Sequence, residues 1–136
     1  MNVLKQIDIW LCCHSKRYKL HRICKAIGIT PYGWQRDFAL GKTSVLSPEL
    51  RRVRQSGKTM AVILRVLMMD QPSLRLAEWI LMKDPDYIPG QWLRAQWYTW
   101  EYRRQRDKCI KAEIPQIWCY DFRRIYSSGR ERGIGL

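Results

Sequence analysis

The residue types that carry out most protein chemistry are scattered along this chain. One local group near the N-terminus contains both thiols and imidazoles: Cys12, Cys13, His14, His21 and Cys24. Zinc sites usually show paired Cys-x₂-Cys or His-x₃-His spacings, and this group has neither. We therefore interpret these cysteines as small core residues, and we expect neither a metal nor another cofactor.

Acid–base and phosphoryl-transfer chemistry have equally little support. Asp86 and Glu101 could form a nuclease-like carboxylate pair only if strands held a metal between them, and Glu101 falls in a predicted helix. The block Ser-Gly-Lys-Thr at 56–59 matches the end of a phosphate-binding loop, but the position of the first glycine is Arg52. With two histidines and dispersed acids, the chain is predicted not to be an enzyme.

The strongest compositional feature is positive charge. The chain of 136 residues has 25 Lys+Arg against 12 Asp+Glu, a formal net charge of +13, and it is 46% hydrophobic, which is enough for a core. Residues 1–65 hold 13 basic against 3 acidic side chains, whereas residues 66–136 hold 12 against 9. A surplus of this size favours a polyanionic partner, above all nucleic acid.

No segment of the sequence is expected to enter a membrane. The longest apolar stretch, Thr59 to Met69, is short and contains Arg65, whereas a bilayer span needs about 20 apolar residues. The N-terminus lacks the features of a signal peptide, and the five cysteines are odd in number with two adjacent. A cytoplasmic location is therefore expected.

Helical periodicity dominates the chain and predicts an all-α fold. We expect a compact single-domain bundle of about six helices over residues 1–126, with a basic half at 1–65 and an aromatic-rich half at 66–126, followed by a flexible tail at 127–136. Helical segments are predicted at 2–13, 18–27, 31–40, 48–57, 58–69, 72–81, 91–112 and 115–126. The apolar run 58–69 also fits a buried strand, but no partner strand is evident.

The helix predicted at 91–112 has two apolar stripes on nearly opposite sides. One stripe contains Leu93, Trp97 and Trp100, and the other contains Ala95, Tyr98, Tyr102 and Cys109. A helix that is apolar on two sides lies either at the centre of a fold or between the fold and a partner chain.

Residues 20–42 carry the apolar and small positions of a two-helix motif. Ile23, Cys24, Ile27 and Gly28 give the first helix and its turn, and Ile29, Thr30 and Trp34 give the apolar residue, polar cap and inward residue that follow. This segment resembles the helix-turn-helix of the Cro/repressor DNA-binding family. A simple helical hairpin within the core is the alternative.

The resemblance implies a DNA-binding transcriptional regulator that reads the major groove with residues 30–40, for which a homodimer would be usual. Tyr32, Gln35 and Arg36 would face base edges, where Gln pairs with adenine and Arg with guanine. Basic flanks would contact phosphates. The predicted binding set is Lys16, Arg17, Lys19, Thr30, Tyr32, Gln35, Arg36, Lys42, Arg51, Arg52 and Arg54.

Two other functions stay open at this point. An RNA or single-strand binder would stack unpaired bases on Tyr98, Trp100 and Tyr102, beside the arginine-rich end of the same helix. An inhibitor or adaptor would bind an acidic surface on another protein, and its support is the two-sided helix at 91–112 together with the aromatic helix predicted at 115–126.

Overall fold

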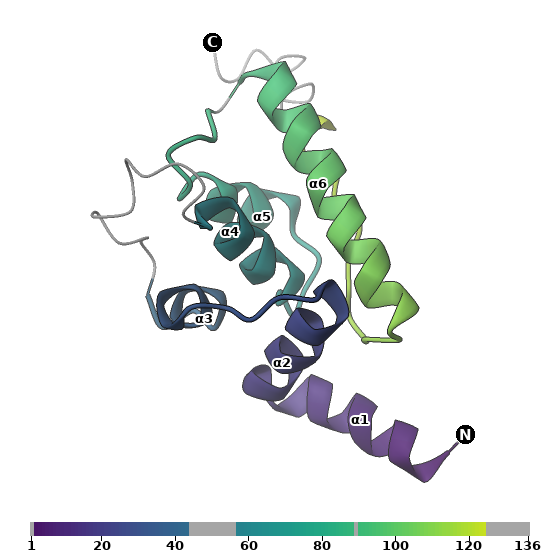
Figure 1. Cartoon of the computed structure of the whole chain (residues 1–136). Coiled ribbons are helices and arrows are strands. Elements are labelled where there is room, and N and C mark those ends of the chain that lie inside the picture. The colour runs from purple at the N-terminus through teal and green to yellow at the C-terminus, as the bar shows by residue number, and fades with distance from the viewer. Residues whose placement is uncertain (1, 44–56, 89, 125–136) are drawn as a thin grey trace.

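The computed structural model describes residues 2–43, 57–88 and 90–124, which form six α-helices with no strand among them (Figure 1). The prediction of an all-α domain is confirmed. The helices are α1 (Val3–His14), α2 (Lys16–Ile27), α3 (Gly33–Ala39), α4 (Lys58–Leu67), α5 (Leu74–Leu81) and α6 (Trp92–Lys111). The predicted helix at 48–57 and the predicted tail at 127–136 lie almost wholly outside the described residues.

Local capping explains where several helices begin and end. The side chains of Asn2, Ser15 and Ser73 each accept a backbone N–H in the first turn of α1, α2 and α5. Gly28 ends α2 in the left-handed conformation, with φ of 86°, and donates its N–H to the carbonyl of Cys24. The predicted glycine stop is therefore confirmed.

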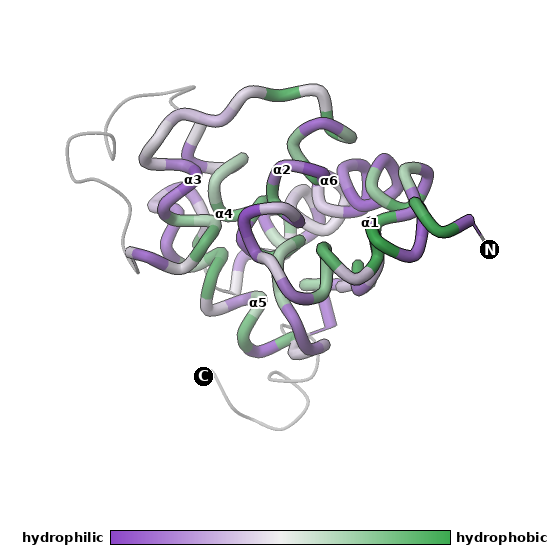
Figure 2. The backbone as a smooth tube through the Cα atoms, turned by 90° about the horizontal axis from the view of Figure 1, so that it is seen from below, coloured by the Kyte–Doolittle hydropathy of each residue, from purple (hydrophilic) through white to green (hydrophobic). Residues whose placement is uncertain are grey.

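α1 lies at one edge of the molecule. It packs on α2, and its N-terminal end extends away from the other helices (Figure 1). Much of α1 is green in Figure 2, the colour of hydrophobic residues. Cys12 is nevertheless the single buried residue of this helix.

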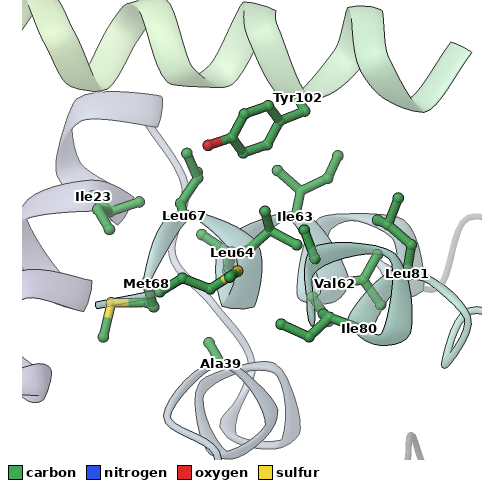
Figure 3. Packing of buried hydrophobic residues seen from close by; sticks show 14 of the residues in the cluster. Ile23, Ala39, Val62, Ile63, Leu64, Leu67, Met68, Ile80, Leu81 and Tyr102 are labelled. Carbon is green, nitrogen blue, oxygen red and sulfur yellow. The ribbon is translucent and has the colours of Figure 1, made fainter. Parts of the chain in front are cut away.

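α4 is the central helix of the bundle, and its packing explains why residues 58–67 are helical. Side chains from α2, α3, α5 and α6 surround it (Figure 3). Six of its apolar side chains are buried: Ala61, Val62, Ile63, Leu64, Val66 and Leu67. A helix that is apolar all round must be covered on all sides, so the preference for helix over strand is confirmed.

The predicted helix from Pro115 is wrong over residues 115–121. Glu113 and Gln116 have φ of 61° and 58°, which ends helical geometry. The chain then runs back beside α6 in a non-helical path (Figure 1). Side chains of other elements form hydrogen bonds with its backbone groups. Tyr102 donates to the carbonyl of Trp118, and the Phe122 N–H donates to the hydroxyl of Thr99 at 2.9 Å.

A buried carboxylate links three helices on the other side of the core. Asp84, in the turn after α5, is fully buried. One oxygen accepts from the hydroxyls of Thr59 in α4 at 2.9 Å and Tyr98 in α6 at 2.5 Å, and the other accepts the Asp86 N–H at 3.0 Å. Burial and this bond raise the pKa of Tyr98, so its hydroxyl stays a donor.

No helix in the described part of the chain is both long enough and apolar enough to cross a membrane.

Candidate nucleic-acid interface

A groove of about 680 Å³ separates α2 from α3. The turn at 28–32 joins the two helices, but α3 packs mainly on α4, which leaves a space between α3 and the outer face of α2. The lining residues are Arg17, Leu20, His21, Cys24, Lys25, Ile29, Thr30, Pro31, Arg36, Asp37, Leu40 and Lys42. The groove therefore lies within the segment that carries the helix-turn-helix resemblance.

The walls of this groove are strongly basic. Arg17 and Lys25 come from α2, whereas Arg36 and Lys42 come from α3 and the residues after it. All four side chains are exposed, and none forms an ion pair with another described residue. Asp37 is the one acid in the lining, so the groove carries a clear surplus of positive charge.

The α2 wall follows from helical spacing. Arg17, His21 and Lys25 stand four residues apart, so they lie along one face over about 12 Å. Leu20, Ile23 and Ile27 lie on the side of α2 that packs into the core. Core packing on one side of the helix thus fixes the basic row on the other.

The floor of the groove is apolar. Leu20 and Cys24 are buried beneath the basic side chains. Burial raises the pKa of the Cys24 thiol, and the nearby positive charge of Arg36 offsets part of this rise. A thiol held in its protonated form is a poor nucleophile, so Cys24 is a floor residue of the groove and is poorly suited to nucleophilic chemistry.

The structure brings together four of the predicted binding residues. Arg17, Thr30, Arg36 and Lys42 all line the groove. Lys16 and Tyr32 are exposed but are not part of its lining, and the Tyr32 side chain is 67% exposed. Arg51, Arg52 and Arg54 lie outside the described residues.

The prediction that Lys19 contacts phosphate is wrong. Lys19 is 2% exposed, and its ammonium donates to the carbonyl of Gln116 at 3.3 Å. Burial lowers the pKa of this side chain. The basic cluster at 16–19 therefore divides, with Arg17 in the groove and Lys19 in the protein interior.

The prediction that Gln35 faces base edges is also wrong. Gln35 is 5% exposed; its amide oxygen accepts the Tyr32 N–H at 2.8 Å and its amide nitrogen donates to the Gly57 carbonyl at 3.0 Å. A Cβ added at Gly57 would lie 2.3 Å from that nitrogen. Gln35 is thus a structural residue that joins the start of α3 to the start of α4.

α3 also begins later than predicted. Thr30 and Pro31 lie in the turn, and Tyr32 is the N-cap of a helix that starts at Gly33. Among the lining residues that the predicted set omits, His21 and Lys25 are the two that continue the row of Arg17 along α2. Their four-residue spacing from Arg17 is the sequence signal that identifies them.

The two-sided character of α6 is confirmed by its burial pattern. Ala95, Tyr98, Tyr102 and Cys109 are buried, whereas Leu93, Trp97 and Trp100 are 78%, 45% and 59% exposed. Tyr98 and Tyr102 are therefore not available to stack on bases. A second, shallower hollow of about 370 Å³ lies beside Trp97 and Trp100.

No protein-family model matches this chain, and comparison with curated proteins and with solved structures gives no match. Within the described ranges, no three His, Cys, Asp or Glu side chains come together in a way that could hold a metal ion.

Proposed function

We propose that this chain is a nucleic-acid-binding protein whose α2–α3 groove binds the phosphate backbone. The observation that carries the proposal is the set of four exposed cations on two facing walls, Arg17 and Lys25 against Arg36 and Lys42. Ion pairs elsewhere on α1 and α2 neutralise charge: Asp8 binds Arg22 at 2.8 Å, and Glu113 binds Lys5 at 2.9 Å. The groove cations have no such acidic partner among the described residues.

Duplex DNA is the form that this groove suits best. A duplex presents its backbone as a regular raised ridge, and cations on both walls of a groove can contact successive phosphates of one strand. Tyr32 and Arg36 then stand near the edge of the base pairs. With Gln35 buried, Arg36 is the predicted base-reading residue that keeps a bidentate donor for guanine. A sequence-reading regulator would use Arg36 at a base edge in place of a phosphate, while Arg17, Lys25 and Lys42 hold the backbone.

The test is a fluorescence-anisotropy titration of labelled duplex DNA, single-stranded DNA and RNA at two salt concentrations. We expect duplex binding that weakens steeply with salt, because each phosphate contact adds about −0.9 to the slope of log K against log salt. Absence of duplex binding at low micromolar protein and low salt would contradict the proposal. Equal affinity for all duplex sequences would leave a nucleic-acid binder but would exclude a sequence-reading regulator.

The same titration also tests a second candidate function, which rests on α6. Trp97 and Trp100 share the hollow described above with Arg103 and Arg123, a combination that suits unpaired bases and their phosphates. This function predicts that single strands bind at least about tenfold more tightly than duplex, since one stacked base contributes about 1–3 kcal/mol. It also predicts that Trp100→Ala removes that preference.

A further inference from the structure

α1 leaves an apolar side open to solvent and uses its two charged side chains for contacts with the rest of the molecule, which is unusual for a surface helix. Asp8 accepts from the guanidinium of Arg22 at 2.8 Å and from the hydroxyl of Tyr18, and Lys5 forms an ion pair with Glu113 at 2.9 Å. Both charged side chains of α1 therefore bind the rest of the molecule.

The opposite side of α1 is apolar and open. Val3, Leu4, Ile7 and Trp10 are 67%, 73%, 49% and 58% exposed. The Trp10 ring stacks on His14, with ring centroids 4.3 Å apart. A row of large apolar side chains exposed at the edge of a helical bundle marks an interaction surface.

The spacing of this row indicates another helix as the partner. On this side of α1, residues 3, 7, 10 and 14 are separated by four, three and four positions, which is the spacing of a coiled-coil seam, and Leu4 lies beside that seam. A helix that lies in a membrane interface has a broader apolar face, with lysine and arginine along its polar side. α1 has Lys5 as its one basic residue of that kind, and Glu113 pairs with it.

Charge indicates which helix that partner is. A chain with a net charge of +13 repels its own copies, so contact between two copies costs the least electrostatic free energy where the surface carries no charge. The exposed seam of α1 contains no Lys, Arg, Asp or Glu. An uncharged apolar seam is also complementary to itself, as a two-fold interface requires.

We propose that the exposed seam of α1, formed by Val3, Ile7, Trp10 and His14, binds the same seam of a second copy and makes a homodimer. This interface does not depend on nucleic acid. None of the four groove cations is part of the seam, so the proposed interface and the groove use different side chains.

The test is sedimentation equilibrium of the full chain at protein concentrations from about 1 to 100 µM without nucleic acid. The wild-type chain should reach twice its mass of 16.4 kDa. Ile7→Lys and Trp10→Glu should each weaken dimerisation at least about tenfold, because each places a charge in the seam. Circular dichroism should show unchanged helix content, since both side chains are about half exposed.

Leu93→Lys is the matched control for Ile7→Lys. Leu93 is an exposed apolar residue on α6, and both substitutions add one positive charge. The control should dimerise like the wild type. A wild-type chain that stays monomeric at every concentration would overturn the proposal, as would a dimer that Leu93→Lys disrupts and Ile7→Lys does not. A monomer that binds phosphatidylcholine–phosphatidylserine vesicles through Ile7 would show a lipid occupant instead, and would also overturn it.

Discussion

Reversing the charge of Arg36 and Lys42 together, in an Arg36→Glu, Lys42→Glu variant, should reduce affinity for duplex DNA at least about 50-fold at 0.1 M salt. Each phosphate contact contributes about 0.9 log unit at that salt concentration through release of counterions. Two lost contacts therefore account for about a 60-fold loss, and repulsion between glutamate and phosphate adds to it. Both side chains are exposed, so the variant should fold normally.

The control for this variant changes the same number of charges elsewhere. Arg75 in α5 and Arg94 in α6 are exposed and are not part of the groove lining. An Arg75→Glu, Arg94→Glu variant should lose less than about threefold in affinity, because salt screens charges beyond roughly 10 Å. Equal losses in the two variants would show that binding follows net charge and not the groove.

Replacing Asp84 with alanine should destabilise the fold by about 2 kcal/mol or more. The buried hydroxyl of Tyr98 would lose its acceptor, and a buried donor without a partner costs about 1–3 kcal/mol. The part-buried hydroxyl of Thr59 and N–H of Asp86 would also lose their acceptor, at a smaller cost each. Domains of this size have a free energy of unfolding of about 5–15 kcal/mol. In urea unfolding monitored by circular dichroism, this loss of unfolding free energy should appear as a lower urea concentration at the midpoint.

Asp86 provides the control, because it is exposed and lies two residues away. Asp86→Ala should change the free energy of unfolding by less than about 0.5 kcal/mol. The loss of unfolding free energy in Asp84→Asn should lie between those of Asp84→Ala and Asp86→Ala, because the asparagine amide keeps one acceptor oxygen. If Asp84→Ala unfolded at the wild-type urea concentration, the carboxylate would not be the link between α4, α5 and α6.

Local patterns were enough to predict most helices of this fold. The buried stripe of α6 follows from apolar periodicity, and the end of α2 follows from one glycine. Helix α4 follows from an apolar run for which the sequence offers no partner strand. Residues 115–121 have the same kind of periodicity but are not helical. The backbone partners of this segment, Thr99 and Tyr102, lie on α6, and no local pattern in residues 115–122 reveals them.

The candidate site shows the same limit. Lys19 and Gln35 look like exposed polar residues, but their partners at Gln116 and Gly57 are distant in the sequence. The sequence indicated a basic N-terminal half, and Arg17, Arg36 and Lys42 were predicted from it as binding residues. The groove that brings these residues together depends on how α3 packs against α4, which is a tertiary property.

The central claim, that cations in the α2–α3 groove bind backbone phosphates, is tested most directly by the salt dependence of duplex binding in two neighbouring variants. Arg17 lines the groove and Lys19 is buried, although they lie two residues apart in α2. Arg17→Met should reduce the magnitude of the log–log salt slope by about 0.9, and Lys19→Met should leave it unchanged. A slope that falls for Lys19→Met and stays constant for Arg17→Met would contradict the claim.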